Sequence, residues 1–272
     1  MTYLWQFFPL FTSIQWFDDF YPQGKTSIPS RFNLPGKIAW AFMETPGFVC
    51  LLYCMLTIPH AQGIEKLPAA NWLMAVLFSI HYLYRAIISP LFLNPSMSPI
   101  HPLILLFALS FQVINGTCIG GYLAGYGPST QADWAGATIR IQLGLLIFFA
   151  GFIGNIYHDD ELREIRRAAA RRQKRKAEAQ REKGKEPQVD KVYEIPQNGL
   201  FRLVLYPHFF CEWIEWCGFW VIGGLACGPA RTFLINEITT MTPRALSGKR
   251  WYIERFGKEK VGSKRAVIPG LI

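Results

Sequence analysis

Glu44 is a carboxylate inside an apolar block, and its presence there calls for a chemical explanation. It lies in the middle of the stretch from Lys37 to His60, which is about long enough to cross a bilayer. A charged side chain in hydrocarbon is costly, so such residues usually face a cavity or a partner. Glu44 has no charged neighbour within its own block. We therefore predict a functional role for this carboxylate.

Three other apolar blocks carry polar groups that could take part in the same chemistry. "SIHYLYRAII" places Tyr82 and Arg85 near the end of its block, and "HFFCEWIEWCGFW" places Glu212 and Glu215 on one helical face. "GNIYHDDELREIRR" carries a single helical stripe, which comprises Asn155, Asp159, Arg163 and Arg166. Structural explanations stay open: an interfacial tyrosine belt, an ion pair between helices, and arginines that snorkel to water. Together the groups describe a pocket with a charged rim and an apolar floor, suited to a large anionic cofactor and a lipid-like substrate.

The apolar residues gather in blocks near twenty residues long, which predicts an all-α integral membrane protein. Hydrophobic residues make up 51% of the 272-residue chain. We expect seven transmembrane helices in a single domain over residues 1–272, because each block can satisfy its backbone hydrogen bonds internally. The expected spans are residues 2–17, 38–58, 68–89, 103–123, 138–157, 203–226 and 230–242. The first has neither a basic region before its apolar stretch nor a small-residue cleavage site, so we expect it to be retained.

The distribution of Lys and Arg predicts the orientation of the bundle. These residues concentrate in the segment 162–191 and in the C-terminal tail, which should both be cytosolic, as should the 18–37 loop with Lys25, Arg31 and Lys37. The loops near 59–67 and 124–137 together hold one basic residue, Lys66. The sequence therefore predicts an external N-terminus and a cytosolic C-terminus. Residues 166–187 are expected to be a charged cytosolic insertion, and the absence of interleaved aromatics argues against nucleic-acid binding.

Some common kinds of site have no signature in this chain. The six cysteines form no CxxC pair and the five histidines form no HExxH motif, so we predict neither a metal site nor a disulfide framework. No GxGxxG follows a strand, which excludes a Rossmann nucleotide site.

An ordered set of motifs from about Gly24 to the C-terminus resembles the membrane-embedded steroid 5-alpha-reductase family, the 3-oxo-5-alpha-steroid 4-dehydrogenases. The motifs are "AWAFMETPGF", "HYLYR", "GNIYHDDELREIR", "YEIPQNGLF", "EWIEWCG", "RAL" followed by "RWYIERF", and "KRAVIP". Each motif alone is weak, and the order makes the resemblance specific. The family fold is a seven-helix membrane bundle with a cytosolic C-terminus, as the charge distribution predicts independently.

The resemblance implies hydride transfer from NADPH to the beta carbon of an enone, which reduces the delta-4 double bond of a 3-oxo-delta-4 steroid to a 5-alpha-dihydro product. By motif position, Glu44 and Tyr82 would contact the 3-oxo oxygen, with Glu44 protonated or sharing a proton with Tyr82. Donors aimed at that oxygen would stabilise the negative charge that develops on it.

The resemblance also implies an NADPH site, in which arginines would pair with phosphates. Its residues are Arg85, Asn155, Asp159, Arg163, Arg166, Tyr193, Pro196, Gly199, His208, Glu212, Arg244 and Tyr252. The chain departs from the family pattern at His208, where asparagine is usual, at Cys211 and Asn198, where glycine is usual, and at Gly248, where histidine is usual. These departures concern cofactor contacts more than the reaction class.

Other functions stay open. Polyprenol and trans-enoyl-CoA reductases share the fold group, and membrane methyltransferases that use S-adenosylmethionine have similar C-terminal segments but lack the carboxylate–tyrosine pair. A transporter or scaffold is less well supported, because no internal repeat is visible.

We expect a steroid or steroid-like substrate and membrane lipids as partners, with no nucleic acid and no obligate protein partner. The expected location is a multi-pass membrane protein, in the endoplasmic reticulum of a eukaryote or the inner membrane of a bacterium, with its cofactor site facing the cytosol.

Overall fold

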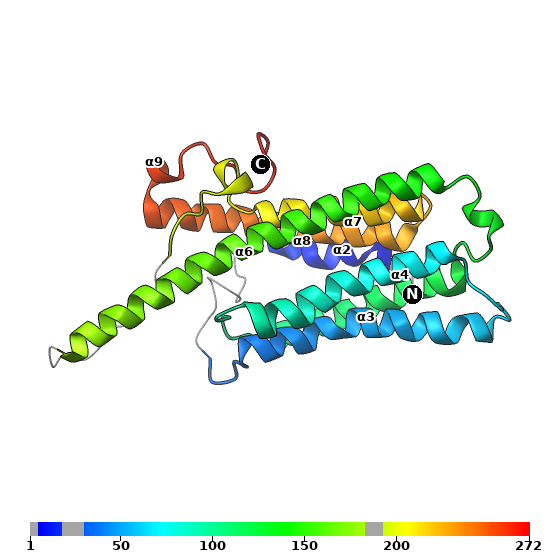
Figure 1. The fold of residues 1–272 in the computed structure, drawn as a ribbon, viewed down its shortest axis with the longest axis horizontal. Coiled ribbons are helices and arrows are strands. Elements are labelled where there is room, and N and C mark those ends of the chain that lie inside the picture. Colours follow the sequence, from blue (N-terminus) through cyan, green and yellow to red (C-terminus); the bar gives the residue numbers. More distant parts are fainter. Residues whose placement is uncertain (1–4, 18–29, 183–192) are drawn as a thin grey trace. The chain divides into compact units, whose positions relative to one another are not determined.

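The computed structural model describes residues 5–17, 30–182 and 193–272. The predictions for Lys25, for the start of the first span and for residues 183–187 of the charged insertion lie outside these residues. Every regular element that is described is a helix (Figure 1). The α-helices are α2 (Phe8–Thr12), α3 (Gly36–Ala61), α4 (Ala69–Tyr82), α5 (Pro102–Gly121), α6 (Thr138–Glu182), α7 (Pro207–Gly223), α8 (Gly228–Phe256) and α9 (Lys258–Val261). The other described helices are of the 3-10 type, η1 (Ser13–Trp16), η5 (Ala132–Trp134) and η6 (Gly199–Arg202), or of the π type, η3 (Leu83–Leu93) and η4 (Tyr122–Tyr126).

Four helical stretches are long and apolar enough to cross a membrane. They are Gly36–Ala61, Ala69–Leu93, Pro102–Tyr126 and Thr138–Glu178. Large apolar side chains stay exposed on them, as at Leu56, Leu106 and Leu146, and exposed apolar surface of this kind fits a lipid environment. The chain is therefore an all-helical, multi-pass membrane protein. The count of seven spans and their orientation remain predictions.

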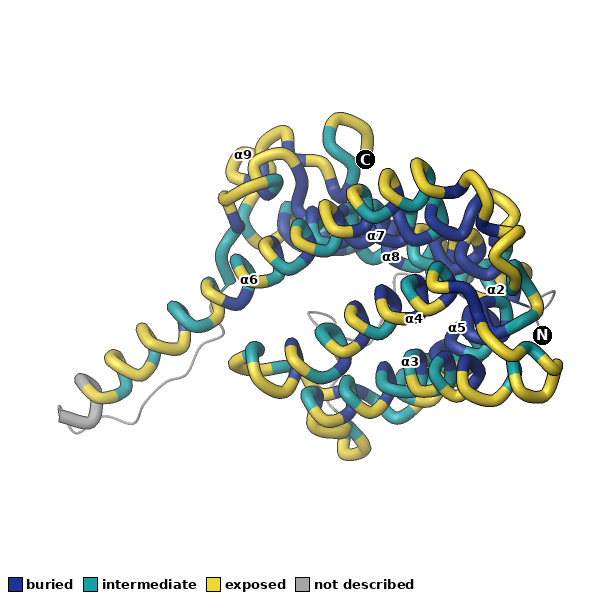
Figure 2. Tube along the Cα trace, turned by 45° about the vertical axis from the view of Figure 1, so that its right-hand side comes forward, coloured by how far each residue is buried: buried dark blue, intermediate teal, exposed yellow. Residues whose placement is uncertain are grey.

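Helix α6 extends far beyond the span expected at 138–157 and continues to Glu182. No Gly or Pro interrupts residues 155–182, which are rich in the strong helix formers Ala, Arg, Lys, Glu and Gln. The described part of the charged insertion is thus a helical extension of the span rather than a loop. Figure 2 shows this end of α6 mostly in yellow and teal, as exposed or half-buried. Between Arg163 and Glu178, Ala169 is the one described residue that is buried.

The other expected spans are placed with shifted ends. The segment expected at 203–226 is α7, which begins at Pro207, a residue favoured in the first helical turn because it lacks an N–H to satisfy. The segment expected at 230–242 lies inside α8, which continues through Pro243 to Phe256. After Tyr82, α4 continues as the π-helical η3, a geometry that is rare at this length and that often marks functional sites.

The described residues group into two compact units. Unit 1 comprises Met1–Phe152 and Cys211–Arg244, and unit 2 comprises Ile153–Phe210 and Ala245–Ile272. The helices α6, α7 and α8 each continue from one unit into the other. The single domain predicted for residues 1–272 remains a prediction.

Glycines bring helix backbones into direct contact within unit 1. A Cβ at Gly116 of α5 would overlap the carbonyl oxygen of Gly47 in α3, and one at Gly218 of α7 would overlap the backbone of Phe148 in α6. Small residues permit this close approach between membrane helices. The α3–α5 contact at Gly47 lies one turn from Glu44.

A buried asparagine ties together the end of unit 1 where η4 and η5 lie. Asn71 Nδ2 donates to the carbonyl oxygens of Leu123 at 2.7 Å and Pro128 at 2.6 Å, and Asn71 Oδ1 accepts from Trp134 Nε1 at 2.8 Å. Both Nδ2 and Oδ1 of this buried amide therefore have hydrogen-bond partners, as buried polar groups usually do.

Unit 2 is closed by pairing between the segment after η6 and the C-terminal tail. Leu205 N donates to the Arg265 carbonyl at 3.0 Å, and Arg265 N donates to the Leu203 carbonyl at 2.8 Å. The Lys264 ammonium donates to the carbonyl oxygen of Phe201. Burial lowers the pKa of Lys264, because it disfavours the charged form.

Candidate active site

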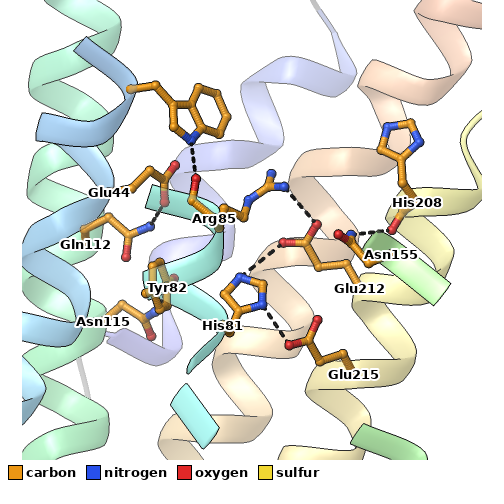
Figure 3. A network of polar contacts seen from close by, with 11 residues as sticks. Glu44, His81, Tyr82, Arg85, Gln112, Asn115, Asn155, His208, Glu212 and Glu215 are labelled. Carbon is orange, nitrogen blue, oxygen red and sulfur yellow. Dashed lines mark hydrogen bonds and ion pairs between the residues drawn. The ribbon is translucent and has the colours of Figure 1, made fainter. Parts of the chain in front are cut away.

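Glu44 is held by an amide from the neighbouring helix. It is only 8% exposed, and Gln112 Nε2 of α5 donates to its Oε2 at 2.5 Å (Figure 3). Gly47 lies one turn further along α3, where a Cβ would approach Gln112 Oε1 to 2.5 Å. Glycine at this position therefore makes room for the amide that orients Glu44.

Tyr82 has a similar partner from the same face of α5. It is 2% exposed and ends α4, and Asn115 Nδ2 lies 3.4 Å from its hydroxyl. Gln112 also interacts with Tyr82. Because Gln112 and Asn115 are three residues apart on α5, one helical face holds both the carboxyl and the phenol.

The carbonyl oxygens of the two amides accept no hydrogen bond from the described residues. Gln112 Oε1 and Asn115 Oδ1 are buried and make no hydrogen bond to any described residue. The rings of Phe78 and Trp216 pack near Tyr82, with centroids 4.6 Å and 6.2 Å from its own. The surroundings are thus polar atoms set in an aromatic wall, as in small-molecule sites generally.

A chain of ionisable side chains runs from the buried interior of unit 1 towards Arg85 (Figure 3). His81 Nδ1 lies 2.8 Å from Glu215 Oε1, and His81 Nε2 lies 3.8 Å from Glu212 Oε1. Arg85 Nη1 lies 3.5 Å from Glu212 Oε2, and the Arg85 side chain is 21% exposed. The Arg85 guanidinium also stands 5.4 Å over the Trp40 ring. Each of these four ionisable side chains has a partner of opposite sign or a hydrogen-bond partner, which offsets the cost of its burial.

Unit 1 thus brings together five of the residues singled out by sequence: Glu44, Tyr82, Arg85, Glu212 and, through its electrostatic interaction with Glu44, Arg244. Sequence reasoning missed their amide partners. The signal was "FQVINGT", in which two polar residues share one face of an apolar helix. An uncharged amide in an apolar helix is a weaker signal than a carboxylate.

Unit 2 holds the rest of the predicted cofactor set. Asn155 Nδ2 donates to the His208 carbonyl at 2.9 Å. Arg163 is buried, with its Nε 3.3 Å from Asp160 Oδ1. Arg166 is exposed and interacts electrostatically with Tyr252, and burial raises the pKa of Tyr252 to about 12. Asp159 lies half-buried on the same helix.

His158, which the sequence did not single out, anchors the glycine turn of unit 2. Leu200 N donates to His158 Nε2 at 3.0 Å, so Nδ1 carries the proton and donates to the Gly154 carbonyl at 2.6 Å. Gly199 has φ of +57°, and a Cβ there would lie 2.8 Å from His158 Nε2. Both the conformation and the close approach require glycine.

Aromatic and cationic groups meet around Tyr193. Its ring lies 4.9 Å from the Trp251 ring, and the Arg255 guanidinium stands 4.8 Å over it. Pro196 is buried three residues further on. Aromatic rings can stack on a nucleotide base and guanidinium groups can pair with its phosphates, so the residues of unit 2 fit a dinucleotide phosphate.

Tyr206 occupies the space beside Gly248, the position at which histidine is usual in the family. A Cβ at this position would overlap the Tyr206 hydroxyl. The phenol of Tyr206 therefore fills the space into which a side chain at 248 would project. The two positions have to be considered together, because a larger residue at 248 requires Tyr206 to move.

Comparisons with known proteins identify the family of this chain. A family model described as 3-oxo-5-alpha-steroid 4-dehydrogenase matches residues 97–272. The chain belongs to this family. The family is one of NADPH-dependent enone reductases, which confirms the resemblance seen in the motifs.

Individual relatives match along more of the chain than the family model does. An uncharacterized protein of Schizosaccharomyces pombe is 31% identical, over 92% of this chain and 91% of its own length. Steroid 5-alpha-reductase DET2 of Solanum lycopersicum is 28% identical, over 97% of this chain and 92% of its own length. The human 3-oxo-5-alpha-steroid 4-dehydrogenase 1 is 27% identical, over 91% and 85%. These matches show the family, and the substrate of this chain is a separate question.

Proposed function

We propose that this protein reduces the delta-4 double bond of a 3-oxo-delta-4 steroid to the 5-alpha-dihydro product, with NADPH as the reductant. The observation that carries the proposal is the pair of buried acids, Glu44 and Tyr82, each held by an amide of α5. Family membership supports the reaction class.

The amides orient the protons of both acids. Gln112 donates to Glu44 Oε2, so a proton on the Glu44 carboxyl belongs on Oε1 and is available to a substrate. Asn115 donates to the Tyr82 oxygen, which leaves the phenolic proton free to be donated elsewhere. Both protons would be directed at the 3-oxo oxygen. Two donors at that atom stabilise the enolate that forms when the beta carbon is reduced.

NADPH, when bound, supplies the hydride to the beta carbon. In unit 1, Arg85, Glu212 and Arg244 would hold it, and Glu212 is itself fixed by Arg85 and His81. In unit 2, the proposed residues are Asn155, Asp159, Arg163, Arg166, Tyr193, Pro196, Gly199, His208 and Tyr252. Arg166 and the aromatic group around Tyr193 are suited to phosphates and to a base.

We further propose the membrane arrangement that the charge distribution predicts. Seven helices would span the bilayer as a single domain, with the N-terminus outside and the C-terminus in the cytosol. The cationic residues of α6 support this orientation. NADPH would then reach the protein from the cytosol.

The test is steady-state kinetics in detergent, with NADPH oxidation followed at 340 nm in the presence of testosterone or progesterone. Glu44→Gln and Tyr82→Phe should each lower kcat by about 100-fold or more while NADPH binding is kept, because each removes a donor to the developing charge. Matched controls are Glu65→Gln and Tyr53→Phe, two exposed positions that should leave the rate unchanged.

Two other outcomes would refute the substrate or the reductase class. Wild-type protein that binds NADPH without oxidising it in the presence of steroid would keep the reductase class and refute the steroid substrate, and polyprenal or enoyl-CoA substrates would be tried next. Folded protein that binds S-adenosylmethionine and no NADPH would refute the reductase proposal.

A further inference from the structure

Four asparagines are buried among the described residues, and one of them differs from the others. Asn71, Asn115, Asn155 and Asn236 are all 3% exposed or less. The first three each donate a hydrogen bond, to backbone carbonyls or to Tyr82. Asn236 is fully buried, and neither its Nδ2 nor its Oδ1 has a hydrogen-bond partner among the described residues.

An amide without partners is costly inside a protein. Transfer of such a group out of water without compensating hydrogen bonds is strongly unfavourable, and most buried polar groups are therefore paired. A leucine, which has a similar branched shape, would avoid this cost. The presence of asparagine in an inward-facing position thus points to a partner that arrives with a ligand.

The position of Asn236 on α8 places it beside the candidate active site. Phe233, one turn earlier, has its ring 4.5 Å from that of Trp216 and 6.1 Å from that of Phe111. Glu237, the next residue, interacts electrostatically with Tyr82 and Glu44. Asn236 therefore lies within one helical turn of the aromatic wall and next to a residue that interacts with the catalytic acids, within unit 1.

We propose that Asn236 is a specificity-determining residue that hydrogen-bonds a second oxygen of the substrate, at the end remote from the reacting enone carbonyl. The inference rests on the proposed function, because it assumes that an enone occupies the site of Glu44 and Tyr82. An asparagine amide offers two N–H donors and one carbonyl acceptor. A substrate hydroxyl can pair with either part, and a ketone can accept from Nδ2.

The substrate class follows from this chemistry. The preferred ligand carries a hydroxyl or a carbonyl at its far end, and a substrate that is hydrocarbon apart from its enone leaves Asn236 unpaired. Sites with a buried hydrogen-bonding group discriminate strongly against analogues that cannot pair with it.

The test uses three steroids that share the 3-oxo-delta-4 group and differ at carbon 17: testosterone with a hydroxyl, androstenedione with a ketone, and androst-4-en-3-one with neither. Dissociation constants are measured on purified protein by ligand-dependent fluorescence, without turnover, and KM values are measured beside them. Wild-type protein should bind the two oxygenated steroids about tenfold more tightly than the third. Asn236→Leu should bind all three within about twofold of one another.

Asn71→Leu is the matched control, because it makes the same substitution at a buried asparagine whose hydrogen bonds are satisfied. It should lower the melting temperature and leave the ratio of the dissociation constants unchanged. Asn236→Leu should keep or raise the melting temperature, since it removes an unpaired amide.

Two results would overturn the inference and leave the proposed function standing. One is wild-type protein that binds and reduces all three steroids equally well. The other is an Asn236→Leu variant that keeps the wild-type ratio or melts as early as Asn71→Leu, which would make the amide structural. Wild-type protein that binds none of the three would instead refute the steroid function itself, and the inference with it.

Discussion

Replacing Gln112 with methionine should slow catalysis much more than it unfolds the protein. The side chains have similar length, but methionine cannot donate the 2.5 Å hydrogen bond that Glu44 Oε2 accepts. A buried acceptor left unpaired costs about 1–3 kcal/mol. If the lost bond orients Glu44 for its work at the transition state, kcat should fall roughly 5- to 150-fold.

The assay is NADPH oxidation with testosterone at saturating cofactor, together with a thermal melt. The KM for NADPH should stay within about twofold, because Gln112 is outside the proposed cofactor set. Gln131→Met, at an exposed loop position, is the matched control and should behave as wild type. An unchanged kcat for Gln112→Met would refute the orienting role, and a loss confined to the KM for NADPH would show that Gln112 acts on the cofactor instead.

Three further predictions concern stability. Gly116→Ala should destabilise the protein by about 1–3 kcal/mol and so lower its melting temperature, since the new Cβ would overlap the Gly47 carbonyl. Gly121→Ala, whose Cβ would have its nearest neighbour at 3.6 Å, should be tolerated, and equal melting temperatures for the two variants would contradict the backbone contact. His81→Leu leaves the buried Glu215 carboxyl without its partner, and Glu215→Leu leaves His81 Nδ1 unpaired, so each should destabilise the protein by about 3–5 kcal/mol. The double variant should recover part of this loss, and strictly additive effects in denaturant melts would argue against the pair. Hydrogen bonds from Thr130 and Ser129 lower the pKa of Asp133 below its usual 3.8. The ionised carboxylate therefore stabilises the fold above pH 3.8, and this contribution is lost as the pH falls through the lowered pKa. Asp133→Ala should have a lower melting temperature than wild type at pH 7, and a difference that persists unchanged at pH 2 would contradict the assignment.

The membrane class and the family could be predicted from sequence, because both depend on signals that are local or ordered along the chain. Blocks of apolar residues near twenty long gave the helices that could span a bilayer, and the motif order gave the family. The role of Glu44 and Tyr82 at a carbonyl was predicted on the same basis and remains a prediction.

What sequence could not supply were contacts between distant residues. The His81–Glu215 hydrogen bond joins residues 134 positions apart, and no spacing rule identifies it. Gln112 and Asn115 are uncharged, so their place in an apolar helix is a weak signal compared with that of a carboxylate. The compensation between Gly248 and Tyr206 likewise depends on tertiary packing.

Helix ends were also difficult to predict. Hydropathy marks where a segment stops being apolar, and helix propensity decides where the helix stops. In α6 these two limits differ, because the polar residues after 157 are themselves good helix formers.

The exposed end of α6 has a consequence for how this protein can vary. Arg172 pairs with Glu194, and none of the described side chains from Gln173 to Glu178 is buried. A stretch whose side chains are mostly exposed carries little constraint of shape, so insertions or deletions there should cost the bundle little. Natural relatives are therefore free to differ in length at this position. For the experimenter, the same stretch is the place to insert a fluorescent or affinity tag without disturbing the buried acids.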